Sequence, residues 1–231
     1  MKIFNYKLKH KFQLIVVTLA LLLVPKVFLA QDNSDKDKGW YIQPGILLVN
    51  FLEDSEVSAA GAPIPGASLK LSNDTSPSVQ FGYNFSKKFS ISSLVAIPPK
   101  TTATGEGPLD GLTAGKVSFV PIILSANYHF TLKNFKPFIG AGINYTIISK
   151  EEDANIINLK ADNMFGPIIR GGFDFMFSKK WGFNASATMN FIKTDLTGSV
   201  DPSIPDLGGA PVEASVTVNP LAIQLGLVYK L

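Results

Sequence analysis

Residues 181–191 read W-G-F-N-A-S-A-T-M-N-F, and this stretch contains the pattern that decides the fold. Apolar side chains occupy every second position, and Gly, Asn, Ser or Thr fills the positions between them. Successive side chains of a β-strand point to opposite faces, so this segment is predicted to be a strand with one apolar face and one small polar face. The same period of two recurs at 78–85, 120–130, 137–147, 165–177 and 221–231, and less regularly at 40–51 and 89–97.

The distribution of polarity indicates what surrounds these strands. A water-soluble barrel would carry Lys and Glu along its outward faces, but charged residues are scarce in the eight segments. An apolar outer face is stable in a bilayer when the small polar face lines a closed interior. The sequence therefore predicts an all-β fold, an eight-stranded antiparallel transmembrane β-barrel.

The connections between the segments favour the same fold. Short links at 86–88, 131–134 and 178–180 alternate with long links at 52–77, 98–115, 149–163 and 194–212. This is the pattern of an outer-membrane barrel with short periplasmic turns and long outer loops. Aromatic residues beside the short turns and chain ends predict an interfacial belt. They are Trp40, Tyr41, Tyr83, Phe85, Phe89, Tyr128, Phe130, Phe135, Phe177, Trp181 and Tyr229.

The first 30 residues have the composition of an export signal. A basic start precedes an apolar run at 12–24, and Ala30 marks the expected cleavage site. The apolar run is too short for a spanning helix, although an uncleaved anchor stays open as an alternative. We expect a signal peptide at 1–30, a polar lead at 31–39 and the barrel at 40–231, in the outer membrane of a Gram-negative bacterium.

After residue 30 the chain has 16 basic and 18 acidic residues, and this balance excludes a nucleic-acid-binding surface. The chain has no Cys, so thiol chemistry and disulfides are excluded as well.

One segment of the fifth predicted strand is distinctive. Residues 137–146 read P-F-I-G-A-G-I-N-Y-T and follow Y-H-F at 128–130. Further matches are I-P-P-K at 97–100, Pro121, N-P at 219–220 and G-L-V-Y at 226–229. In these features the chain resembles the outer membrane protein W (OmpW) family of small eight-stranded barrels, although that family usually ends in an aromatic residue and this chain ends in Leu231. The resemblance implies a narrow, largely apolar conduit for small hydrophobic molecules, and it implies contact with outer-membrane lipids and the outer-membrane assembly machinery.

Four ionisable residues are predicted to form a polar network in the lumen: His129, Arg170, Asp174 and Lys230. Arg170 and Asp174 share the inward face but lie about 13 Å apart along their strand, so each should pair across the lumen. An acidic loop residue is a candidate partner for Arg170, and His129 or Lys230 for Asp174. The network either plugs the lumen or contacts a ligand. His129 alone, without neighbouring ligands, does not make a metal site or a catalytic centre, so we predict no enzyme activity, no metal and no cofactor.

Apolar residues in the long loops are unusual for segments that face water. They predict an apolar entrance for ligands, or alternatively loops that only pack against one another. The residues are Ile64, Leu69, Leu71, Ile156, Leu159 and Leu207. Acidic runs in the same loops could meet divalent cations between lipopolysaccharide phosphates. Besides the conduit, a second function stays open: a structural or adhesive barrel whose outer loops bind envelope or host components.

Overall fold

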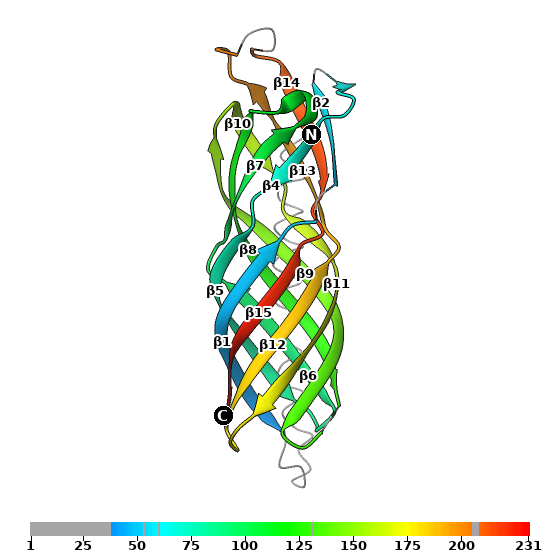
Figure 1. The fold of residues 1–231 in the computed structure, drawn as a ribbon, viewed down its shortest axis with the longest axis vertical. Coiled ribbons are helices and arrows are strands. Elements are labelled where there is room, and N and C mark those ends of the chain that lie inside the picture. The colour runs from blue at the N-terminus through cyan, green and yellow to red at the C-terminus, as the bar shows by residue number, and fades with distance from the viewer. Residues whose placement is uncertain (1–37, 53, 60, 131, 205–207) are drawn as a thin grey trace, which may run out of the picture. The chain divides into compact units, whose positions relative to one another are not determined.

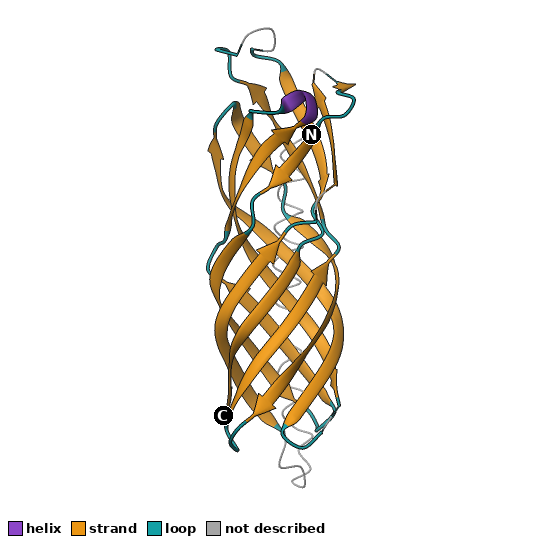
Figure 2. Cartoon of the chain, viewed as in Figure 1, coloured by secondary structure: helices purple, strands orange, loops and turns teal. Residues whose placement is uncertain are grey.

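Eight antiparallel strands close into a barrel (Figures 1 and 2). The structure, a computed structural model, describes residues 38–52, 54–59, 61–130, 132–204 and 208–231. The barrel strands are β1 (Gly39–Asn50), β5 (Asp74–Asn84), β6 (Phe89–Ala96), β8 (Thr113–His129), β9 (Phe135–Asp153), β11 (Met164–Met176), β12 (Trp181–Asn190) and β15 (Leu221–Lys230). Their order is β8-β6-β5-β1-β15-β12-β11-β9, and the pairing of β9 with β8 closes the ring.

Beyond one end of the barrel, further strands build a second tier, which Figure 1 shows at the top. β2 (Asp54–Ala59), β3 (Ala62–Pro63), β10 (Ile156–Ala161), β13 (Lys193–Val200) and β14 (Pro211–Thr217) form a five-stranded sheet. β4 (Ser68–Leu71) and β7 (Lys100–Glu106) extend the barrel sheet along β8, and a 3-10 turn at Gly107–Leu109 follows β7. We call this end the outer end, and the end with the short turns and the strand termini the inner end.

Side-chain exposure confirms the predicted orientation of the strand faces. Phe81, Phe183 and Leu225 are 43–53% exposed on the outside of the barrel, whereas Asn184 and Gln224 are at most 3% exposed. The barrel is therefore apolar outside and polar within, as a bilayer requires. Among the residues that the structure describes, no helix has the length and hydropathy to cross a membrane.

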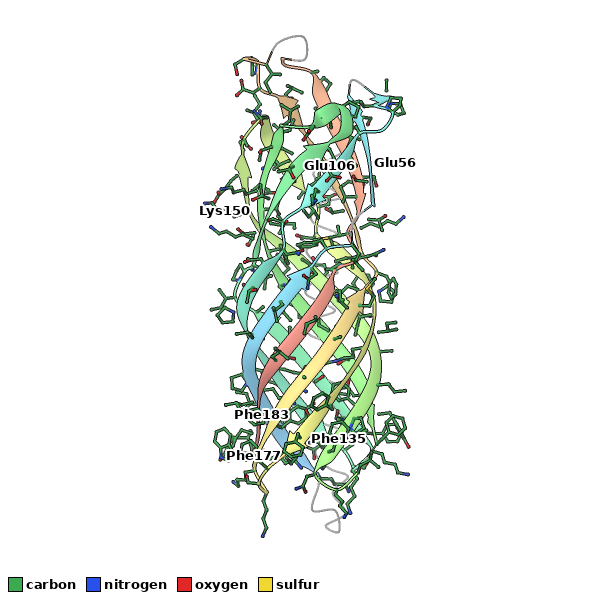
Figure 3. The ribbon with its side chains drawn as sticks, viewed as in Figure 1. Glu56, Glu106, Phe135, Lys150, Phe177 and Phe183 are labelled. Atoms are coloured by element: carbon green, nitrogen blue, oxygen red, sulfur yellow. The ribbon has the colours of Figure 1, made fainter. Side chains whose placement is uncertain are left out.

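The aromatic belt forms at the inner end, where Figure 3 labels Phe135 and Phe177. Rings pack edge to face between neighbouring strands, with centroids 5.1 Å apart for Trp40 and Tyr83 and 5.1 Å apart for Phe89 and Tyr128. The prediction was wrong for Tyr41, which is 5% exposed and lies inside the barrel. Because Trp40 points outward, the next residue of the same strand must point inward.

The long links were predicted to be loops, and this prediction was also wrong in part. Six strands lie in them almost entirely, a seventh, β14, begins at the end of the last link, and β8 and β9 run several residues further outward than the predicted segments. These strands lack an apolar outward face because water can solvate that side of an antiparallel sheet. The lipid-facing pattern therefore stops where the outer tier begins. The expected signal peptide and most of the polar lead lie outside the described residues.

Candidate functional site

The outer tier encloses an apolar cavity of about 70 Å³. Its walls come from β2, β4, β10, β13 and β14 and from the segment around the 3-10 turn. Residues that line it include Val57, Ile64, Leu69, Ile156, Leu159 and Leu196. Polar side chains contribute little to the lining, with Asn155 and Thr197 the exceptions. The cavity therefore suits an apolar molecule and offers few groups that would select a polar one.

Four of the six residues predicted for the apolar entrance line this cavity: Ile64, Leu69, Ile156 and Leu159. Leu71 packs against the same apolar cluster without lining the cavity. Leu207 lies outside the described residues. Several lining residues were not predicted because they belong to strands in the segments that the sequence analysis treated as loops. A period-two search of those segments would have pointed to Leu196 and Val212, which alternate with polar neighbours.

A second apolar cavity, of about 30 Å³, lies in the outer half of the barrel. Leu47, Phe119 and Ile123 line it, together with three buried polar side chains, Asn144, Thr146 and Asn190. The buried apolar clusters of the outer tier and of the barrel share two flanking residues, Phe51 and Ile148. An apolar column therefore runs from the outer tier into the barrel.

A polar plug fills the lumen below this column, and Arg170 organises it. The Arg170 side chain is 5% exposed and donates to four neutral partners. They are Gln80 Oε1 at 2.9 Å, Ser92 Oγ at 3.3 Å, Ser125 Oγ at 3.1 Å and Ser186 Oγ at 3.1 Å. Arg170 also lies 5.2 Å from the centroid of the Phe138 ring. A buried guanidinium needs such a set of acceptors, because each unpaired N–H in the interior costs stability.

Two glutamines link this arginine to Asp174. The Gln80 amide donates to Gln43 Oε1, and Gln43 Nε2 donates to Asp174 Oδ1 at 3.2 Å. Asn184 Nδ2 donates to the same carboxylate oxygen at 2.7 Å. Arg170 and Asp174 are thus connected by two amide side chains, each of which donates its hydrogen bond in the direction of the carboxylate. An acidic loop residue was expected to pair with Arg170; within the described residues, its hydrogen bonds go instead to neutral groups of the barrel wall.

The other predicted members of the network meet at the inner end. His129, Asp174 and Lys230 line a cavity of about 20 Å³ together with Tyr41 and Lys136. The His129 ring shares a 2.8 Å hydrogen bond with Ser90 Oγ. The described residues contain no group of three or more His, Asp or Glu side chains placed to hold a metal ion. The arrangement resembles a packed polar interior more closely than a reactive site.

Residues 42–231 match the family described as the OmpW family. The chain belongs to the OmpW family. It is 30% identical over 207 residues to the dibenzothiophene metabolism operon protein PahQ of Pseudomonas aeruginosa, which covers 89% of this chain and 95% of that protein. It is 28% identical over 172 residues to outer membrane protein W of Vibrio cholerae, covering 70% of this chain and 76% of that one.

Solved structures of outer-membrane barrels have the same fold as this OmpW-family chain. The crystal structure of OprG from Pseudomonas aeruginosa superposes with a TM-score of 0.78 at 25% identity, over 86% of this chain and 99% of that one. The structure of AlkL in lipid bilayers superposes with a TM-score of 0.64 at 22% identity, over 87% of this chain and 95% of that one. The protein is therefore an outer-membrane barrel whose wall contacts lipid. Because the turns at the inner end are short, we expect this end on the periplasmic side.

Proposed function

We propose that this OmpW-family protein is a narrow conduit that binds small hydrophobic molecules at its outer end and carries them into the outer membrane. The observation that carries the proposal is the apolar column, which begins in the outer-tier cavity and continues into the barrel. Apolar surface that is enclosed in this way, on the side of the protein that faces the surroundings of the cell, has a clear use in capturing apolar compounds from water.

The relatives support the same class of substrate. PahQ is named for an operon of dibenzothiophene metabolism, and dibenzothiophene is a flat, apolar, sulfur-containing aromatic compound. The outer cavity, at about 70 Å³, is smaller than the roughly 150 Å³ cavity that binds benzene in a protein core. A fused-ring compound therefore needs the lining side chains to move apart when it binds. Because these side chains come from the outer tier, the barrel itself need not open for this step.

The proposal is tested by uptake of the hydrophobic fluorophore N-phenyl-1-naphthylamine in intact Gram-negative cells that express the protein. Ile156→Asn places an amide in the cavity wall, and Leu52→Asn is the matched control on an exposed side chain outside the cavity. An unpaired amide in an apolar site costs about 1–3 kcal/mol, so the initial uptake rate should fall at least about fivefold in Ile156→Asn. A gel that compares boiled and unboiled samples verifies that both variants fold.

Uptake that is equal in Ile156→Asn and in Leu52→Asn would contradict the conduit. The alternative, an adhesive barrel whose outer tier binds envelope or host components, would then be the better interpretation. We also propose that residues 1–30 are removed during export, which N-terminal sequencing of the protein from outer membranes would test. We further propose that the outer-membrane assembly machinery recognises the exported chain and inserts it into the outer membrane.

A further inference from the structure

Charge is divided unequally between the two ends of the barrel. The inner end carries eight lysines, which we call the lysine collar: Lys38, Lys87, Lys88, Lys133, Lys136, Lys179, Lys180 and Lys230. Among the described residues of this end, Asp174 has the one acidic side chain, and it lies inside the lumen. The outer end carries six lysines and twelve acidic residues in the described part of the chain. Figure 3 labels Glu56 and Glu106 there, at the opposite end from Phe135 and Phe177.

The collar surrounds the whole barrel. The strand order places the β5–β6 turn opposite the β11–β12 turn, and the β8–β9 turn opposite the ends of β1 and β15. Each of these four positions carries two lysines of the collar, and three of the eight, Lys87, Lys136 and Lys230, also line the inner-end cavity. A partner that docks from one side would meet half of these charges, whereas lipid surrounds the barrel on every side.

Two opposite turns of the collar are built in the same way. Residues 85–89 read F-S-K-K-F and residues 177–181 read F-S-K-K-W. In the first, Ser86 Oγ accepts the backbone N–H of Lys88 at 3.2 Å, and in the second, Ser178 Oγ accepts the backbone N–H of Lys180 at 3.3 Å. The serine side chain fixes each tight turn, so its two lysines stand exposed beyond the last residues of the strands.

The aromatic belt sets the depth of these lysines in the membrane. Aromatic residues flank both turns directly, and aromatic belts of membrane proteins lie at the level of the lipid headgroups. Lysines one or two residues beyond the belt therefore place their ammonium groups at the phosphate level of the periplasmic leaflet. Clusters of lysines at this depth attract anionic lipids.

We propose that the lysine collar binds the phosphates of anionic phospholipids in the periplasmic leaflet and gathers these lipids around the inner rim of the barrel. The acidic outer end has the opposite character. There Lys150 Nζ donates to Glu152 Oε1 at 2.6 Å, a contact that lowers the pKa of the Glu152 carboxyl.

The test measures lipid preference at the protein surface by electron spin resonance. The folded barrel is placed in phosphatidylcholine vesicles that contain trace spin-labelled phosphatidylglycerol or spin-labelled phosphatidylcholine. The collar variant K87Q/K88Q/K179Q/K180Q removes four charges from the inner rim. The matched control K100Q/K116Q/K160Q/K193Q removes four exposed lysines from the outer end.

The wild-type protein is expected to associate with phosphatidylglycerol about twofold or more strongly than with phosphatidylcholine at low salt. The collar variant should lose most of this preference, and the control variant should keep it. In 1 M salt the wild-type preference should also disappear, because the screening length falls to about 3 Å. The proposal is wrong if the wild-type protein shows no preference at low salt, or if the control variant loses as much as the collar variant.

Discussion

Replacement of Arg170 by Met tests whether the buried guanidinium stabilises the folded barrel through its hydrogen bonds or destabilises it through the cost of its desolvation. Met has a similar length but no hydrogen-bond donor, so the four bonds of the guanidinium are lost. Ser92 and Ser125 still bond to one another at 2.9 Å. Two acceptors, Gln80 Oε1 and Ser186 Oγ, are left without their donor. At about 1–3 kcal/mol for each buried unsatisfied group, Arg170→Met should lower the free energy of unfolding by about 2–6 kcal/mol.

The assay is urea unfolding in short-chain phosphatidylcholine vesicles, followed by the different migration of folded and unfolded barrels on gels. Arg170→Lys should lose less stability, since its ammonium group can still donate to some of the same oxygens. Ile169→Met, on the neighbouring outward-facing position, is the control and should change the free energy of unfolding by less than about 0.5 kcal/mol. Replacement of a buried ion by an apolar side chain sometimes stabilises a protein. If Arg170→Met were as stable as the wild-type protein, the desolvation of the guanidinium would outweigh its bonds, and the reasoning would be refuted.

Two further predictions concern single strands of the barrel. A Cβ at position 82 would collide with the Tyr41 ring, so Gly82→Ala should displace that ring and lower the free energy of unfolding by about 1–3 kcal/mol. The near-ultraviolet circular dichroism should change as well, and an unchanged spectrum would argue against the close packing of this pair. Leu124 faces lipid between the aromatic belt and the outer tier. Leu124→Lys should therefore lower the free energy of unfolding by about 2–4 kcal/mol in the same urea assay, and a loss under about 1 kcal/mol would place this position outside the hydrocarbon.

The membrane-facing half of the fold was predictable because lipid imposes one simple pattern on every strand. The less regular segments show where that prediction was incomplete. In residues 89–97 the apolar Leu94 occupies a position where the alternation calls for a small polar residue, and its side chain is 2% exposed and points inward in step with Ser90 and Ser92. The run at 46–49 is equally regular, with Ile46 exposed and Leu47 buried. Toward the outer end apolar side chains such as Leu47, Leu94 and Ile123 join the lumen, so both faces of β1 and β6 carry apolar residues there. The assumption of a uniformly polar lumen was wrong.

The lumen contacts were less predictable than the lumen residues. Period two places Arg170 and Asp174 on the inward face, but their partners depend on which residues meet across the barrel. That depends on the register of all eight strands, and an error of one residue in any strand would change every pair. The glutamine link through Gln43 and Gln80 is a result of this register. For the outer cavity, the sequence predicted only the apolar side chains and not the strands that carry them. The outer faces of these strands contact water and not lipid, so they lack the apolar pattern that marks the membrane-spanning strands.

The pairing of β1 with β15 differs from the other contacts of the ring, since every other neighbouring pair is joined by the next stretch of chain. Tyr41 meets Lys230 and Asn50 meets Leu221 across this seam, so the first and last strands must find one another after the rest has been made. Until the final strand arrives, two rows of backbone N–H and C=O groups stand open, and a hydrocarbon environment does not tolerate open rows. A chain that stops near residue 221 would therefore lack β15, and the edges of β1 and β12 would have no partner to close the ring.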